Sequence, residues 1–281
     1  MTGTTTGSAA WPALADFVHR HPRLLVLTGA GLSTRSGIPC YRDEHGAWQH
    51  AAPMHGQQFR RDPEARQRYW WRSMHRWPRI AAAMPNAGHE ALASLARAGH
   101  AHVVTQNVDG LHARTGIAAI ELHGSLHAVV CLGCGTHTSR SVLQEMLVAR
   151  NDYPPASAAR AAPDGDAGHP PVPPGFAVPQ CAQCCGVLMP DVVFHGDAVP
   201  PTRVAAARAL LDAADALLVV GSSLTVYSGY RFCVWAAAAG KPIAAINRGP
   251  TRADGLLRLK IEAECTAVLA TLVRPDVTMV S

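Results

Sequence analysis

Four cysteines stand in two C-x-x-C pairs, Cys131 with Cys134 and Cys181 with Cys184. Two such pairs can surround one Zn²⁺ with four thiolates in a closed tetrahedral site, which leaves no coordination position for catalysis. The stretch between the pairs is longer than in a usual zinc ribbon, but loop length costs little entropy once the ends are held. Cys185 is a competing ligand, although the x-x spacing favours Cys184. We predict one structural zinc ion; redox-active or incidental cysteines are the alternative.

A glycine-rich loop, "TGAGLSTRSG", follows the apolar run Leu24–Thr28. Such a loop after a strand offers backbone N–H groups and a close approach to phosphate, a role that Gly29, Gly31 and Gly37 could fill. The loop does not match G-x-G-x-x-G, because Thr34 occupies the third glycine position. By itself the loop is therefore a weak signal.

Polar residues follow four further apolar runs that we expect to be strands. In an open α/β sheet, ligands bind beyond the carboxyl ends of the strands. Each cluster alone is compatible with ordinary turn and capping chemistry, but together they predict a dinucleotide site. The residues are Gln106, Asn107 and Asp109; His123; Gly221, Ser222 and Ser223; and Asn247, Arg248 and Gly249.

His123 closes one of these runs and precedes Gly124. An imidazole with a pKa near its ordinary value of about 6.5 can accept a proton at pH 7, which makes His123 a candidate general base. The alternative is an ordinary surface or hydrogen-bonded core histidine.

Short apolar runs alternate with alanine-rich segments of helical periodicity, which is typical of a doubly wound α/β fold with a parallel sheet. The predicted strands are Leu24–Thr28, His102–Thr105, Ala119–Leu122, Ala216–Val220, Pro242–Ile246 and Thr266–Leu269. The predicted helices are Trp11–His19, Ala87–Ala98, Thr202–Ala214 and Tyr230–Ala239.

Two regions break this alternation. Residues 53–85 are rich in aromatics and arginine and are expected to be helical, and residues 151–180 are proline-rich and are expected to form a long surface loop. We therefore divide the chain into an N-terminal frayed tail and helix (1–22) and a catalytic domain (23–281). That domain carries the helical insert and a zinc module at about 125–190.

The composition restricts the class of protein. Hydrophobic content of 48% with 16% charged residues indicates a globular chain. The net charge of +5 is mild and scattered, so no nucleic-acid stripe is predicted. No apolar run is long enough to span a bilayer and the N-terminus does not resemble a secretory signal. We expect a cytoplasmic protein whose cysteines are metal ligands or free thiols.

A string of motifs resembles the sirtuins, the NAD-dependent protein lysine deacylases, over about Leu24 to Val268. The motifs, in sirtuin order, are "GAGLSTRSGIPCYR", "TQNVDGLH", "ELHGS", the paired C-x-x-C, "PDVVFHGD", "GSSLTVYSG" and "NRGPTRAD". The insert looks like that of class II, a bacterial and mitochondrial branch. The resemblance implies a Rossmann-like sheet domain with a small zinc module. It also implies transfer of an acyl group from lysine to ADP-ribose, with NAD consumed and nicotinamide released. We expect a monomer that acts on acyl-lysine proteins or peptides.

The resemblance also implies roles for individual residues. His123 would be the base, and Asn107 would order a water and the ribose. Gln106 would reach the nicotinamide ribose, and Asp109 the carboxamide. The pyrophosphate would lie near Gly29, Ala30, Gly31 and Ser33. The adenosine half would lie near Gly221, Ser222, Ser223, Asn247, Arg248, Gly249 and Cys265. Arg42 would lie in a segment, Ser36 to Trp48, that folds over NAD. Val193, Phe194 and His195 would pair with the substrate as an added strand.

The sequence leaves the acyl preference open. Tyr69 and Arg72 share a helix face and resemble the pair with which a desuccinylating branch holds an acidic acyl group. Aromatic packing around Tyr69, a pocket for long, branched or lipoyl groups, and plain deacetylation are the alternatives. Cys40 departs from the aspartate of "GIPDYR" in the family. Mono-ADP-ribosylation of proteins and a non-catalytic NAD sensor are the alternative functions.

Overall fold

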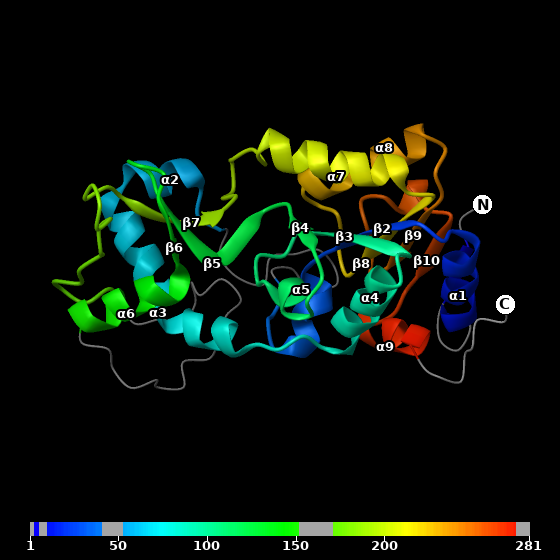
Figure 1. Ribbon diagram of the computed structural model, residues 1–281, viewed down its shortest axis with the longest axis horizontal. Helices are drawn as coiled ribbons and strands as arrows, with labels where there is room; N and C mark the ends of the chain where they lie inside the picture. The colour runs from blue at the N-terminus through cyan, green and yellow to red at the C-terminus, as the bar shows by residue number, and fades with distance from the viewer. Residues whose placement is uncertain (1–2, 6–9, 41–52, 152–170, 274–281) are drawn as a thin grey trace.

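Seven parallel strands form the main sheet of the computed structural model, which describes residues 3–5, 10–40, 53–151 and 171–273 (Figure 1). Across the sheet the order is β1-β10-β9-β8-β2-β3-β4, and each neighbouring pair runs parallel. The strands are β1 (Gly3–Thr5), β2 (Leu24–Thr28), β3 (Ala101–Thr105), β4 (Ala119–Glu121), β8 (Ala216–Val220), β9 (Ile243–Ile246) and β10 (Leu259–Ile261).

Helices cover both faces of this sheet (Figure 1). Successive side chains of β2 point to opposite faces. Leu24 and Val26 pack in one buried cluster, and Leu25 and Leu27 in the other. The first cluster is closed by α1 (Ala10–Arg20), α4 (Ala87–Arg97) and α9 (Cys265–Ala270), and the second by α7 (Pro201–Ala213) and α8 (Tyr227–Ala238). This arrangement confirms the predicted Rossmann-like, doubly wound fold.

Two parts of the sequence prediction are wrong near the sheet edge. Thr266–Leu269 belongs to helix α9 rather than to a strand, and Glu264 caps that helix by accepting hydrogen bonds from the backbone N–H of Thr266 and Ala267. The predicted frayed tail contains β1, which pairs with β10, and neither of these strands was predicted.

A second, smaller unit lies beside the sheet domain (Figure 1). Its three antiparallel strands, in the order β6-β5-β7, pack with three helices around the buried side chains of Phe59, Trp70, Met74 and Leu143. The predicted helical region 53–85 supplies two of those helices. The elements of this unit are α2 (Gly56–Arg61), α3 (Pro63–Ala82), β5 (Gly124–Cys131), β6 (His137–Ser139), α6 (Arg140–Arg150) and β7 (Leu188–Val192). The short helix α5 (Leu111–Arg114) belongs to the sheet domain.

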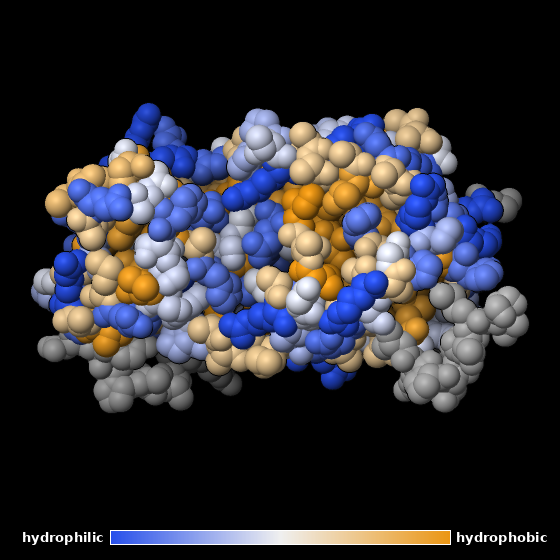
Figure 2. Space-filling model, in the orientation of Figure 1, coloured by the Kyte–Doolittle hydropathy of each residue, from blue (hydrophilic) through white to orange (hydrophobic). Residues whose placement is uncertain are grey.

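The predicted surface loop 151–180 falls partly outside the described residues. Residues 171–179 contain no helix or strand, in agreement with the prediction, and Phe176 from this stretch is buried against Trp71 with ring centroids 5.3 Å apart. In Figure 2 hydrophilic side chains are scattered over the visible face rather than gathered in one band. None of the helices in the described ranges is long and apolar enough to cross a membrane.

Candidate functional site

Five parallel strands end at one edge of the sheet, and the predicted polar residues follow four of them. Since β9, β8, β2, β3 and β4 are consecutive neighbours, the segments after them lie together. This places the glycine loop after β2 between the segments that begin at Gln106 and at Gly221. The polar clusters that the sequence predicts at the carboxyl ends of the strands therefore do lie at one edge of the sheet.

The glycine loop packs backbone to backbone against the segment after β8. The loop continues as a 3₁₀ helix, η2 (Ala30–Ser36), and the Gly31 N–H donates to the Gly221 carbonyl at 2.9 Å. A Cβ on Gly31 would lie 2.8 Å from the Gly221 Cα, which is closer than real Cβ contacts. Gly221 itself has φ +61°, a conformation that favours glycine. These two glycines are therefore needed for close chain packing, apart from any role toward phosphate.

Side chains from two of these loops form one hydrogen-bonded group. Ser33 donates to the Asp109 carboxylate at 2.7 Å. Asn107 Nδ2 donates to the Gly29 carbonyl and to Ser33 Oγ, both at 3.1 Å. Asn107 and Asp109 are both nearly buried, so their amide and carboxylate are held in fixed positions at the sheet edge.

Gln106 extends this group toward the segment after β8. Its Nε2 donates to Ser222 Oγ at 2.8 Å. Three of the predicted clusters are thus linked directly, although they come from sequence positions far apart.

His123 follows β4 and is held by two hydrogen bonds. Its Nδ1 lies 2.8 Å from the Gln106 carbonyl oxygen and its Nε2 lies 2.7 Å from Ser228 Oγ. Burial is the main cause that lowers the pKa of His123, and His195, Arg231 and Arg203 lower it further, whereas the bond to Gln106 raises it. A neutral imidazole with a fixed ring is what a general base needs at pH 7.

Ser228 is a residue of this site that sequence reasoning missed. It lies within "GSSLTVYSG", in the first turn of α8, and is 105 residues from His123. A serine at the start of a helix is common, so nothing in the local sequence separates this one from a helix-start residue. Only the three-dimensional arrangement brings it to the imidazole.

The predicted adenosine half lies after β8 and β9 and at the start of α9. Asn247 is nearly buried and its Nδ2 donates to the Arg248 carbonyl at 2.7 Å. Ser223 Oγ lies 3.0 Å from Thr225 Oγ1. Cys265 is buried at the first residue of α9, and burial raises the pKa of its thiol to about 12. Cys265 can therefore line a pocket but is not a reactive thiolate.

The segment expected to fold over NAD falls largely outside the described residues, and Arg42 is among those not described. Cys40 is the last residue of that segment that the structure describes. It is half-buried, and burial raises the pKa of its thiol, so it is also not a thiolate at pH 7.

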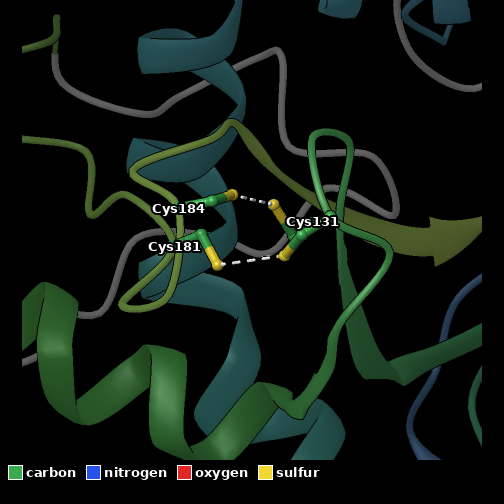
Figure 3. Close-up of side chains that lie close together, drawn as sticks. Cys131, Cys181 and Cys184 are labelled. Carbon is green, nitrogen blue, oxygen red and sulfur yellow. Dashed lines mark hydrogen bonds between the residues drawn. The ribbon is translucent and has the colours of Figure 1, made fainter.

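The four predicted zinc ligands come together in the smaller unit (Figure 3). Their sulfur atoms all lie within 4.8 Å of one another, with Cys131 and Cys184 3.4 Å apart and Cys134 and Cys181 3.7 Å apart. Sulfur atoms at about 2.3 Å from a tetrahedral Zn²⁺ would be about 3.8 Å apart, so the four thiols fit that ion. Cys185 is not part of the cluster.

Glycines allow the two cysteine loops to approach each other. A Cβ on Gly186 would lie 2.9 Å from Cys131 Sγ, and one on Gly133 would lie 3.2 Å from Cys184 Sγ. The short distances show that the cluster leaves no room for side chains at these positions. This supports a closed, structural site.

The predicted substrate residues lie between the two units. The Val193 N–H donates to the His123 carbonyl at 2.8 Å, so the chain after β7 runs past the candidate base. The His195 carbonyl accepts from the Gly56 N–H at 3.0 Å. Part of the polar backbone that an added strand would use is therefore already paired.

Tyr69 packs among aromatic rings. Its ring centroid lies 5.2 Å from that of Phe59, 5.2 Å from that of Trp70 and 5.5 Å from that of Phe194. Tyr69 therefore packs against aromatic side chains, which is the alternative to a role in holding an acidic acyl group. Tyr69 and Arg72 both have further interaction partners, and no acyl preference follows from their positions.

Comparisons with known proteins agree with this geometry. The model of the Sir2 family matches residues 29–228. A Xanthomonas campestris NAD-dependent protein deacetylase is 52% identical over 267 residues, which cover 94% of this chain and 91% of that protein.

Two solved structures show the same fold. A Sir2 enzyme is similar with a TM-score of 0.75 and 30% identity, over 95% of this chain and 97% of that one. A Sir2–p53 peptide–NAD+ complex is similar with a TM-score of 0.74 and 25% identity, over 92% and 95% of the two chains. The chain belongs to the Sir2 family.

Proposed function

We propose that this chain is an NAD-dependent protein lysine deacetylase or deacylase, which moves an acyl group from lysine to ADP-ribose and releases nicotinamide. The observation that carries the proposal is the position of His123. Its half-buried, neutral ring lies at the same sheet edge as the buried Asn107 and Asp109, beside the glycine loop. The similar Xanthomonas campestris protein carries the name of this activity.

The residues at the sheet edge suit the polar groups of NAD. Hydroxyl, amide and carboxylate side chains offer donors and acceptors for the ribose hydroxyls and the nicotinamide carboxamide. We assign Gln106, Asn107 and Asp109 to the nicotinamide half. The pyrophosphate is assigned to Gly29, Ala30, Gly31 and Ser33. The adenosine half is assigned to Gly221, Ser222, Ser223, Asn247, Arg248, Gly249 and Cys265.

His123 is assigned to proton removal. NAD, when bound, supplies the ribose carbon to which the acyl oxygen adds as nicotinamide leaves. His123 would act as the base for a ribose hydroxyl, so that the ribose oxygen can attack the acyl carbon. Because burial lowers the pKa of His123, the ring is in its active, neutral form at pH 7. The zinc ion would stabilise the smaller unit and take no part in these steps.

The substrate is proposed to enter between the two units. The related Sir2 structure with a p53 peptide and NAD+ supports an acyl-lysine peptide as the substrate. Val193, Phe194 and His195 would contact it, with Tyr69 and Arg72 near the acyl end. A panel of peptides that carry acetyl, acidic, long-chain or lipoyl groups on lysine measures which acyl group the site prefers.

Arg42 and its neighbours would cover the reacting ribose and exclude water. We propose a catalytic domain over residues 23–281, to whose sheet residues 1–22 add β1 and α1, with a zinc module at about 125–190. We also retain a cytoplasmic monomer that does not bind nucleic acid. Four cysteine thiols gathered for a metal suit a reducing compartment.

The test is nicotinamide release from NAD with an acetyl-lysine peptide, together with mass spectrometry of the products. Wild type should form O-acetyl-ADP-ribose, and His123→Ala should lose about 100-fold or more of that rate, in the range expected for a general base. His102→Ala, an exposed histidine on β3, is the matched control. Equal rates for wild type and His123→Ala would refute the assignment, and ADP-ribose left on protein would indicate transferase activity.

A further inference from the structure

The hydrogen bonds of His123 define where its proton lies. The Gln106 carbonyl oxygen can only accept, so His123 Nδ1, 2.8 Å away, must carry the hydrogen. In a neutral ring the other nitrogen then has a free lone pair. Nε2 is therefore the acceptor, and Ser228 Oγ, 2.7 Å away, is the donor.

The start of helix α8 holds Ser228 close to the imidazole of His123. Ser228 is nearly buried in the first turn of α8. The next residue is Gly229, where a Cβ would lie 2.3 Å from Gln106 Oε1. Glycine at this position leaves the Gln106 amide undisturbed beside the helix start, and the same helix start carries Ser228 against His123. The serine therefore occupies the lone pair that the proposed reaction uses.

We propose that Ser228 relays the proton from the ribose hydroxyl to His123. The ribose hydroxyl gives its hydrogen to Ser228 Oγ while Ser228 gives its own hydrogen to His123 Nε2. The products are a ribose oxyanion, an intact serine hydroxyl and an imidazolium, so no further reactant is needed.

A serine hydroxyl suits both ends of this transfer, because it can donate and accept. It donates to the neutral Nε2 before the transfer. After the transfer it accepts from the new Nε2–H, while Nδ1–H stays bonded to Gln106. The ring thus keeps one orientation throughout.

The relay rests on the proposed function, and the first test separates the two. Ser228→Ala and Ser228→Thr are compared in two assays: exchange of labelled nicotinamide into NAD, which precedes the base step, and formation of O-acyl-ADP-ribose in a single turnover. Ser228→Ala should slow the second reaction by about 10- to 100-fold and leave the exchange near the wild-type rate. Ser228→Thr, which keeps the hydroxyl, should restore most of the lost rate.

Ser94→Ala, an exposed serine on α4, is the control and should behave as wild type in both assays. A wild-type product rate in Ser228→Ala would overturn the relay, and so would an equal loss in both assays. If wild type itself releases no nicotinamide with an acyl peptide, the proposed function fails instead.

A second test needs no variant. ¹⁵N NMR of wild type with labelled histidine reports which ring nitrogen of His123 is protonated. Protonation at Nδ1 is expected, and protonation at Nε2 would overturn the relay even where a serine variant fails to fold.

Discussion

His89 and His112 lie side by side beneath the polar loops, with their ring centroids 5.0 Å apart and both side chains buried. His112 Nε2 is 3.0 Å from Thr28 Oγ1, Thr28 donates to Thr105 Oγ1 at 2.8 Å, and the Asn107 N–H donates to the same Thr105 oxygen at 3.0 Å. His112 thus begins a chain of hydrogen bonds that ends at the candidate NAD site, and the ring of His89 packs against it.

The histidine pair predicts sensitivity to acid. Burial lowers the pKa of His89 to about 4 and that of His112 to about 3, from an ordinary value of 6.5. Below pH 6.5 the unfolded chain binds protons that the folded protein does not, so the free energy of unfolding falls as the pH drops from 6.5 toward 4. At pH 5 the loss is about 2 kcal/mol for each ring.

Urea denaturation at pH 7 and pH 5 measures this loss. His112→Gln keeps a donor near the position of Nε2 but does not titrate, so it should lose less stability than wild type between the two values. An equal loss in wild type and variant would contradict the assignment.

The cysteine cluster predicts one Zn²⁺ per chain. Cys181→Ser removes one of four thiolates from a site whose sulfur atoms lie within 4.8 Å of one another, and should lower the zinc content and the melting temperature. Cys185→Ser is the matched control and should keep both. Metal analysis and thermal unfolding test the prediction, which fails if the two variants bind the same amount of zinc.

The close contact between Gly31 and Gly221 predicts that even an alanine at position 31 destabilises the protein. Gly31→Ala would place a Cβ 2.8 Å from the Gly221 Cα and 2.9 Å from its carbonyl oxygen, both backbone atoms that cannot easily move away. We expect a loss of about 1–3 kcal/mol in unfolding free energy, the range for overpacking, and weaker NAD binding. Gly255→Ala, where a Cβ meets nothing within 4 Å, should change neither quantity.

The buried guanidinium of Arg140 predicts that replacing it with an uncharged side chain of similar size does not lower the stability of the protein. Its guanidinium is buried over the rings of Trp70 and Trp77, 5.5 Å and 5.0 Å from their centroids, and burial lowers its pKa to about 10. Nη2 donates to Ser73, but Nη1 has no acceptor in the described part of the chain. No carboxylate among the described residues pairs with Arg140, and a buried cation in that position costs free energy that an apolar side chain of similar volume avoids.

Arg140→Met should therefore be as stable as wild type or more stable, whereas Arg140→Ala should lose about 2 kcal/mol or more through the cavity it leaves. Thermal unfolding of the two variants tests the idea. A melting temperature of Arg140→Met well below that of wild type would show that the charge itself stabilises the unit.

The sequence predicts the central strands well because β2, β8 and β9 are buried on both faces and are therefore continuous apolar runs, and β3 departs from this only at the exposed His102. It fails at the edge of the sheet. Thr266–Leu269 is equally apolar, and only the Glu264 cap and packing against α4 make it a helix. Strands β1 and β10 have three residues each, too short for a pattern, and depend on the neighbouring strand for their hydrogen bonds.

In the candidate site, too, residues that belong to a local sequence pattern could be predicted, and residues that depend on tertiary packing could not. Gln106, His123 and Asn247 were predictable because each directly follows a recognisable strand. Ser228 and the histidine pair were not, because their partners are distant in sequence and only tertiary packing brings them together.

Strand β5 has a mechanical consequence. It begins at Gly124, directly after the candidate base, and ends at the zinc ligand Cys131, so one extended segment of about 25 Å connects them. Its partner β7 returns to the same place, where the Val193 N–H bonds to the His123 carbonyl. The metal site and the imidazole are thus at opposite ends of one strand, whose pairing with β7 shifts register between Gly124 and Val129. Loss of the metal site would therefore loosen the backbone on which the imidazole is mounted.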